Sequence, residues 1–343
     1  MKTVYSPDHK LHHARGEWMN GEMVPAFEMP RRAEIILERV NEVKLGEVIA
    51  PKDFGLEPIK RVHADRYVNF LEVAWSEWAK MGRDCDALPM TWPVRQMDMT
   101  REPESIDGRL GFYSFDAGAP ITPGTWQAVR SSANVALTGA EIVKAGARAA
   151  FSLCRPPGHH AAADYMGGYC FINNAAVAAQ WFRDSGAARV AILDVDYHHG
   201  NGTQAIFDAR ADVLVANIHG DPLVEYPFYL GHADERGTGV GEGFNLNYPL
   251  PHGTEFRAWF SALEDACQKI SSYDPDVVVV SLGVDTFKDD PISQFKLESP
   301  DYLRIGQRIA KLGKPTHFVM EGGYAVDPIG LNAVNVLEGF EGA

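Results

Sequence analysis

Short runs of apolar, often β-branched residues recur along the chain and alternate with segments of helical periodicity. The clearest runs are RAAFSLC from 148, RVAILDV from 189, DVLVANIH from 212, DVVVVSL from 276 and THFVME from 316. Apolar runs of this length without polar alternation are typical of strands buried on both faces. Their spacing predicts βα units in an α/β fold with a parallel sheet.

Helices are predicted between and before these runs. INNAAVAAQWFRDSG from 172 begins near an asparagine and stops at a glycine, and SPDYLRIGQRIAKLGKP from 299 starts on serine and ends on Gly-Lys-Pro. Residues 30–43 and 65–82 also have helical periodicity. Residues 81–125 are rich in Gly, Pro, Asp and Met without a clear period, and an irregular stretch of that length is more often functional than idle. We see no linker or repeat and expect one domain over 1–343.

Composition narrows the class of protein. The net charge of -14, from 46 acidic and 32 basic residues, argues against nucleic acid or an anionic membrane as partner. The four cysteines lack paired spacing, which favours buried free thiols over disulfides or a thiolate zinc site. The chain opens without an apolar signal core, and its longest apolar run, 277–284, is too short to span a bilayer, so we expect a cytoplasmic protein.

Candidate metal ligands follow two of the predicted strands. In ILDVDYHHGNGTQ, Asp196 and His198 are two residues apart, so in an extended segment they would project to the same side. Alone, a D-x-H pair is more often structural. However, Asp285 also emerges directly after a predicted strand, and the carboxyl ends of parallel strands meet at one edge of the sheet. Two carboxylates and an imidazole suit zinc or another borderline transition ion better than calcium or magnesium, and they leave positions for water and substrate.

Two further elements reach the same edge. His159 and His160 follow FSLC and a Pro-Pro-Gly turn, where successive side chains need not diverge as they do in a strand. Tyr324 follows THFVM and a glycine pair. Beside a metal, the tyrosyl hydroxyl is a suitable donor to a developing oxyanion. Together these residues predict a metal-assisted amide hydrolase.

RPPGHH, GYCFINNAA, LDVDYHHGNGTQ, SLGVDTFKDDP and MEGGY resemble, in the correct order, the motifs of the zinc-dependent histone deacetylase superfamily. Within it, HKLHHARGE, VPAFEMPRRAE and TPGTW look like the bacterial acetylpolyamine amidohydrolases. The resemblance implies the arginase-deacetylase α/β fold, with a parallel sheet of about eight strands flanked by helices on both faces. It also implies hydrolysis of the acetamide of acetylated polyamines or diamines, which are small cationic substrates, to acetate and free amine.

The resemblance assigns a role to each residue of the site. One Zn2+ is expected on Asp196, His198 and Asp285. His160 would be the base toward the attacking water, with His159 as its electrostatic partner or as the proton donor to the leaving amine, and Tyr324 would bind the carbonyl oxygen.

The same resemblance pairs each histidine with a second residue. His159 pairs with Asp194, and His160 with Asn201, where several histone deacetylases carry aspartate. Because a neutral amide stabilises imidazolium less than a carboxylate does, we expect His160 to be neutral more of the time.

Structural potassium sites are implied as well. One would use Asp194 with backbone carbonyls of Asp196 and His198, and here Asn217 replaces the serine usual in relatives. A second, peripheral site would use carbonyls near Phe207, Arg210 and Val213.

Substrate contacts are carried over in the same way. Tyr169 and Tyr226 match residues that wall the acyl-lysine-like channel, and a distal amine favours carboxylates such as Asp107 and Asp116. Ile292 stands where a eukaryotic polyamine deacetylase has a gatekeeper glutamate, and Gly118 stands where close bacterial relatives have an acid. In those relatives the long insertion builds a homodimer that narrows the mouth of the site. We expect 81–125 to do the same.

Three alternatives remain at this stage. A two-manganese ureohydrolase of the arginase branch would need a further carboxylate two residues after Asp285, where this chain has Phe287. A protein acetyl-lysine deacetylase would use the identical constellation, so it is the serious rival. A non-catalytic binder of acetylated ligands would have a damaged site, whereas all the matching zinc, histidine and tyrosine positions are intact.

Overall fold

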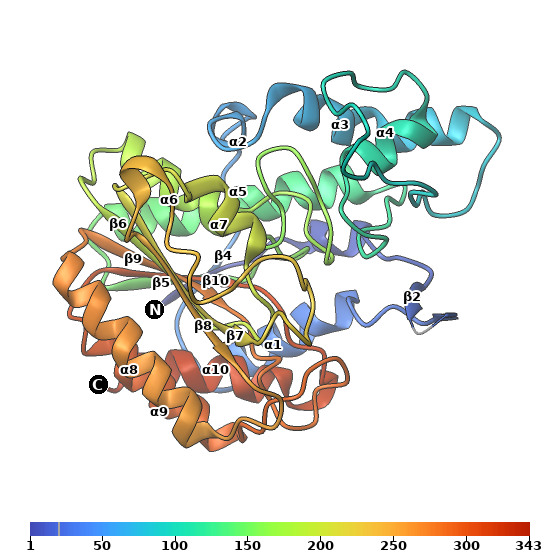
Figure 1. Ribbon diagram of the computed structural model, residues 1–343. Helices are drawn as coiled ribbons and strands as arrows, with labels where there is room; N and C mark the ends of the chain where they lie inside the picture. Colours follow the sequence, from blue (N-terminus) through green and yellow to red (C-terminus); the bar gives the residue numbers. More distant parts are fainter. Residues whose placement is uncertain (20) are drawn as a thin grey trace.

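The computed structural model describes residues 1–19 and 21–343, and a parallel eight-stranded sheet lies at its centre (Figure 1). The strand order is β4-β1-β5-β10-β9-β6-β7-β8, and every neighbouring pair is parallel. The strands are β1 (Lys2–Val4), β4 (Val48–Ile49), β5 (Ala149–Ser152), β6 (Val190–Asp194), β7 (Val213–Gly220), β8 (Asn245–Leu250), β9 (Val277–Leu282) and β10 (Thr316–Met320). A separate antiparallel hairpin is formed by β2 (Glu17–Met19) and β3 (Glu22–Val24).

All five apolar runs form strands, namely β5, β6, β7, β9 and β10, which confirms the predicted α/β class and parallel sheet. The two edge strands, β4 and β8, and β1 beside β4 were not predicted individually. β1 and β4 have only 3 and 2 residues, too few to show a period, and β8 has the mixed sequence NLNYPL.

Helices cover both faces of the sheet. They are α1 (Pro30–Glu42), α2 (Glu57–Lys60), α3 (Asp65–Lys80), α4 (Ile106–Phe112), α5 (Thr125–Lys144), α6 (Asn174–Asp184), α7 (Asn201–Phe207), α8 (Phe256–Tyr273), α9 (Ser299–Ala310) and α10 (Val326–Glu341). In Figure 1, α8, α9 and α10 lie on one side of the sheet, and α5, α6 and α7 lie on the other. The four helices predicted from periodicity correspond to α1, α3, α6 and α9. Because alternate residues of each strand point to opposite faces, both layers of helices find an apolar surface.

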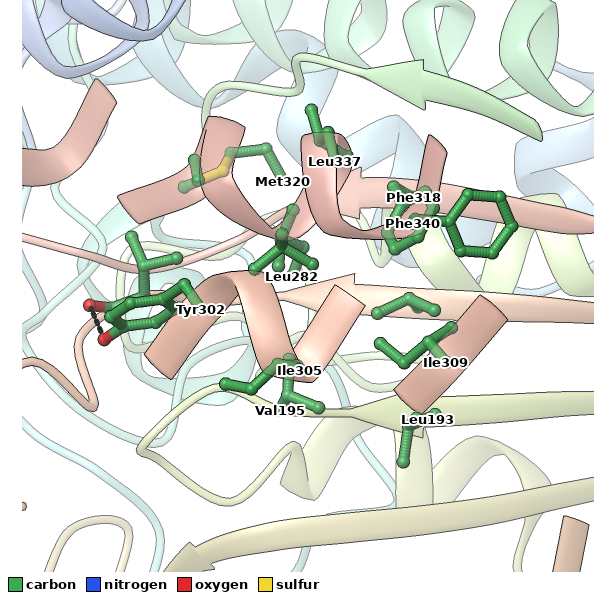
Figure 2. Close-up of a cluster of buried hydrophobic side chains, with 14 of the residues drawn as sticks. Leu193, Val195, Leu282, Tyr302, Ile305, Ile309, Phe318, Met320, Leu337 and Phe340 are labelled. Atoms are coloured by element: carbon green, nitrogen blue, oxygen red, sulfur yellow. Dashed lines mark hydrogen bonds between the residues drawn. The ribbon is translucent and has the colours of Figure 1, made fainter. Parts of the chain in front are cut away.

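Figure 2 shows how α9 and α10 cover the central strands. Side chains of both helices point toward the strands β6, β9 and β10 and the residue that follows β6. They are Tyr302, Ile305 and Ile309 of α9 and Leu337 and Phe340 of α10. These strand-side residues are Leu193, Val195, Leu282, Phe318 and Met320. Burying such side chains stabilises the fold by roughly 1.5–3 kcal/mol each. This packing holds the carboxyl ends of β6, β9 and β10 in place, and the loops that follow these strands start from there.

A smaller apolar cluster lies beside the sheet and includes residues of α2, α3 and α4. The segment 81–125 belongs here. It is more ordered than its sequence indicates, because it contains α4 and its two ends are joined by a bridge between Ala87 and Ile121. Cys85, in this segment, is exposed, so the prediction of buried thiols is wrong for this residue and correct for Cys154, Cys170 and Cys267.

None of the helices formed by the described residues is long and apolar enough to cross a membrane.

Candidate active site

Four neighbouring strands deliver chemically active side chains to one edge of the sheet. β5, β10, β9 and β6 are adjacent in the strand order, and each runs into a loop at its carboxyl end. These loops carry the histidine pair after β5, Tyr324 after β10, Asp285 after β9, and Asp196 with His198 after β6. The sheet thus brings together residues more than 150 positions apart in the chain, from His159 to Tyr324.

Asp196, His198 and Asp285 form a compact group of buried donor atoms, all within 4.8 Å of one another. His198 Nδ1 lies 3.0 Å from Asp285 Oδ2 and 3.5 Å from Asp196 Oδ1. The expected extended segment is wrong, however. The chain bends after β6, and the Asp196 carboxylate accepts the backbone N–H of His198 at 2.9 Å. The two side chains therefore converge through a turn rather than by alternation along a strand.

The charges of this group fit a divalent cation. Burial and the neighbouring carboxylate of Asp196 raise the pKa of Asp285 to about 8. Two buried acids beside one imidazole are unfavourable without a counter-charge, because desolvation penalises each ionised group. Two carboxylate oxygens and one ring nitrogen match the three-ligand sets of catalytic zinc sites. These three residues would hold the metal.

The two histidines of the pair differ in their partners. His159 Nδ1 lies 3.0 Å from Asp194 Oδ2, and His160 Nδ1 lies 2.6 Å from Asn201 Oδ1. These are the contacts expected from the resemblance. In each case Nδ1–H is the donor, so Nε2 is the ring nitrogen left for chemistry.

The two rings have opposite proton affinities. Burial lowers the pKa of His159, but the carboxylates of Asp196 and Asp194 outweigh it and raise the pKa to about 10. Burial lowers the pKa of His160, and the nearby positive charge of His159 lowers it further, to well below its usual value. Of the two rings, His160 is therefore the one suited to accept a proton, and His159 the one suited to stay charged.

Tyr324 is held on a glycine-rich turn beside Asp196 and Asp285. Gly323 has φ +127°, which side chains rarely adopt, and a Cβ on Gly322 would lie 2.6 Å from the Asp196 carboxylate. The guanidinium of Arg32 lies 4.7 Å from the centre of the Tyr324 ring, and its Nε–H donates to the Gly323 carbonyl at 2.6 Å. Arg32 could not be identified from its neighbours in the chain, because its role depends on a contact with a segment 291 residues away.

A cavity of about 410 Å³ leads to this group. Its walls include His160, His198, Tyr324, Tyr169, Tyr226 and Ile292. Gly168 lets the wall close tightly, since a Cβ there would lie 2.4 Å from the His160 ring and 2.7 Å from the Tyr226 hydroxyl. Tyr169, Tyr226 and Tyr324 line it beside His160 and His198, and aromatic walls are usual in small-molecule sites.

Three acids, Glu17, Asp116 and Glu225, line the cavity as well, and Glu225 accepts a hydrogen bond from the Tyr197 hydroxyl. Asp116 accepts a hydrogen bond from the Tyr226 hydroxyl at 2.7 Å and others from the backbone N–H groups of Gly118 and Gly168. Glu17, on the β2–β3 hairpin, accepts one from the Tyr169 hydroxyl at 3.1 Å. Glu17 was missed from the sequence, because a single acid in a strand of three residues carries no signal of its own.

The sequence model described as "Histone deacetylase domain" matches residues 26–340 of this chain. The chain belongs to the histone deacetylase family. Among its relatives, "Acetylpolyamine amidohydrolase 2" of Pseudomonas aeruginosa is 65% identical over 342 residues, covering 100% of this chain and 99% of the relative. "Acetylpolyamine amidohydrolase" of Mycoplana ramosa is 52% identical over 342 residues, covering 100% of both.

A solved structure agrees with this assignment. The crystal structure of an acetylpolyamine aminohydrolase from Burkholderia pseudomallei superposes with a TM-score of 0.94 at 42% identity, covering 99% of this chain and 98% of that one. The histone deacetylase fold expected from the motifs is therefore confirmed.

The remaining residues expected from the histone deacetylase resemblance lie in three places. Asp107 lies on α4, where it forms an ion pair with Arg83, and it is not among the described residues that line the cavity. Asp194 and Asn217 are paired neighbours on β6 and β7, consistent with a shared site. Phe207, Arg210 and Val213 lie at or near the turn between α7 and β7. The potassium sites remain predictions.

Two observations refine the comparison with other members of this fold. Phe287, where the arginase branch needs a carboxylate, is buried in the main apolar cluster. Glu321 was missed, although it stands inside the MEGGY motif. Its carboxylate accepts the backbone N–H groups of Gly158 and His159 at 2.6 and 3.2 Å, which ties the tyrosine loop to the histidine loop.

Proposed function

We propose that the protein is a zinc-dependent hydrolase that removes acetyl groups from acetylated polyamines or diamines. One observation carries the proposal. The buried group of Asp196, His198 and Asp285 adjoins, through His198, a cavity that His160 and Tyr324 also line. The names of the relatives that match this chain along its whole length, at 65% and 52% identity, support the same substrate class.

The residues of the site divide the work as follows. Zinc, when bound, polarises the amide carbonyl and activates water. His160 Nε2 accepts the proton of the attacking water, because the bond from Nδ1–H to Asn201 leaves Nε2 free and the pKa is low. The Tyr324 hydroxyl donates to the carbonyl oxygen as negative charge develops on it. The histidine pair then returns a proton to the leaving amine, and Asp194 keeps His159 oriented and charged.

The cavity supports a thin, cationic substrate. Tyr169 and Tyr226 provide aromatic walls for a methylene chain, and Glu17 and Asp116 place negative charge along the walls. Ile292 also lines the cavity, so discrimination by charge would come from Glu17 and Asp116 rather than from the gatekeeper position.

A homodimer would complete the mouth of the site. The segments that wall the cavity also expose large apolar side chains, which is unusual for a free surface. These are Trp18 and Met23 on the hairpin, Met81, Met90, Val94, Met97 and Met99 in 81–125, and Leu223, Val224, Phe228 and Tyr229 after β7. We infer that 81–125 contributes to the interface. Light scattering of the purified protein should give twice the monomer mass, whereas a monomer would exclude this part of the proposal.

A substrate panel tests the activity. Zinc-reconstituted protein is assayed for acetate release from acetylputrescine, acetylcadaverine, acetylated spermidine and spermine, and an acetyl-lysine peptide. We expect kcat/KM for the best polyamine to exceed that for the peptide by about tenfold or more, because the expected dimer would narrow the mouth of the cavity and exclude a peptide backbone. Higher kcat/KM for the peptide would favour the protein deacetylase instead. Binding without turnover of any acetylated compound would favour a non-catalytic binder.

A further inference from the structure

We propose that Asp290 is a positioning residue that fixes the backbone of Tyr324 and thereby aims its hydroxyl at the reacting carbonyl. The inference rests on the proposed function, since it assumes that Tyr324 stabilises the oxyanion. Asp290 lies in the loop after β9, five positions beyond Asp285, and its side chain is buried, with 6% of the residue exposed.

The carboxylate of Asp290 makes three hydrogen bonds to backbone N–H groups. Oδ2 accepts from Tyr324 at 2.7 Å and from Ala325 at 3.1 Å, and Oδ1 accepts from Ile292 at 3.1 Å. Two of these bonds cross from the β9 loop to the β10 loop, 34 and 35 residues away. Hydrogen bonds to an ionised acceptor are about twice as strong as neutral ones, so this single side chain ties the two loops firmly.

The tyrosine loop needs such an anchor. Gly322 and Gly323 precede Tyr324 because the chain passes against the metal ligands, where a Cβ on Gly322 would lie 2.6 Å from Asp196 and 2.7 Å from Asp285. Glycines leave the backbone more freedom than other residues, so the position of Tyr324 must be set by contacts from outside the turn. Arg32 holds the Gly323 carbonyl on one side of the tyrosine, and Asp290 holds the N–H groups on the other.

The position of Asp290 also matches the electrostatics of α10. Ala325 is the N-cap residue of this helix and offers no side chain to satisfy its first N–H groups. A carboxylate near a helix N-terminus is favoured by the helix dipole and by the unpaired N–H donors. Asp290 therefore anchors both the tyrosine and the start of the helix that follows it. Its third bond, to Ile292, fixes a wall of the cavity in the same loop.

The test is a double-mutant cycle between Asp290→Ala and Tyr324→Phe, measured as kcat and KM of the zinc-loaded enzyme on its best acetylated amine. Asp290→Asn keeps the size of the side chain but loses one acceptor. If the alanine variant does not fold, Asp290→Asn replaces it in the double-mutant cycle with Tyr324→Phe. Asp289→Asn is the matched control, because Asp289 is the exposed neighbour of Asp290 in the same loop. Zinc content and the midpoint of thermal unfolding are measured for every variant.

We expect Asp290→Ala to lower kcat by about tenfold to hundredfold with little change in KM or zinc content, because the loss falls on transition-state stabilisation. In the Tyr324→Phe background the same substitution should lower kcat by less than about twofold, since a residue that acts through the tyrosyl hydroxyl has nothing left to position. Asp289→Asn should match the unmodified enzyme.

Two results would overturn the inference. One is normal kcat in both Asp290 variants, and the other is an equal loss of kcat in the presence and absence of the Tyr324 hydroxyl, which would indicate a general structural role. Failure of the proposed mechanism would be recognised separately, because the single variant Tyr324→Phe would then keep the kcat of the unmodified enzyme.

Discussion

His160 Nδ1 lies 2.6 Å from the Oδ1 atom of Asn201, so the ring is bonded to a neutral amide. The neighbouring His159 is bonded to a carboxylate instead. Two adjacent residues of one loop therefore have different hydrogen-bond partners. Asp194 is the last residue of β6, and Asn201 is the first residue of α7. Burial and the charge of His159 keep the pKa of His160 low, and a neutral amide opposes them less than a carboxylate would.

Asn201→Asp should raise the pKa of His160, because a carboxylate stabilises the imidazolium form. The general base would then be protonated up to a higher pH, so the acid limb of the pH profile of kcat/KM should move to higher pH. The measurement is the pH dependence of acetylpolyamine hydrolysis for both proteins. An acid limb that stays in place, with zinc content unchanged, would contradict the role of His160 as the base.

Metal removal gives a second prediction. Dialysis against a chelator should abolish activity, and added zinc should restore it. Asp285→Asn should leave the unfolding midpoint of the metal-free protein unchanged or raised, because burial and Asp196 already disfavour the charged form of Asp285. Zinc should then stabilise this variant much less than the parent protein, since ligand stabilisation follows affinity.

The readout is the thermal midpoint with and without zinc, together with zinc content. Asp289→Asn, on the exposed surface of the same loop, serves as control. Equal zinc stabilisation of the parent and Asp285→Asn would remove Asp285 from the ligand set.

The fold and the centre of the site could be predicted because both depend on local sequence signals. The apolar runs that form β6 and β9 are followed directly by Asp196, His198 and Asp285, and parallel strands bring their ends together. The turn that joins Asp196 to His198 could not be predicted, because it depends on a side-chain to backbone bond that competes with extension.

The supporting residues were missed for a different reason. Arg32, Glu17 and Glu321 act on segments 152 or more residues away, and nothing near them in the chain indicates the partner. The same holds for the edge strand β4, whose 2 residues form a strand only because β1 offers a free edge. Long-range contacts of single polar side chains require the folded structure.

Asp116 provides a test of substrate recognition. Its carboxylate both carries charge and holds the Tyr226 hydroxyl, so Asp116→Asn should raise KM for an acetylated diamine by about tenfold. A neutral acetylated alkylamine of the same length separates the two effects. If Asp116 acts through its charge, only the KM of the cationic substrate rises. If it acts by holding Tyr226 in the cavity wall, the KM of both substrates rises. Asp98→Asn, an exposed acid in the same segment, is the control, and an unchanged KM for both substrates would exclude Asp116 from recognition.

Glu28 is the centre of a buried ion cluster behind the tyrosine loop. Its carboxylate lies 2.8 Å from Arg32 Nη1 and 2.8 Å from Arg155 Nε, and all three side chains are almost fully buried. Glu28→Gln would leave two buried guanidinium groups without their counter-charge. The free energy of unfolding should fall by about 3–5 kcal/mol, because breaking a buried pair costs far more than breaking an exposed one.

Glu38→Gln is the matched control, since Glu38 forms an exposed ion pair with Arg31 on α1, and its loss should cost less than about 1 kcal/mol.

The dependence on pH gives a second check. Burial raises the pKa of Glu28, but Arg155 and Arg32 outweigh it and hold the pKa below its usual value. A depressed carboxyl pKa stabilises the fold above the unfolded-state value and loses that effect as pH falls through the folded-state value. In urea unfolding, the difference between the parent protein and Glu28→Gln should therefore be full at pH 7 and narrow below about pH 4. A difference that stays constant over this range would mean that packing, rather than charge, explains the loss.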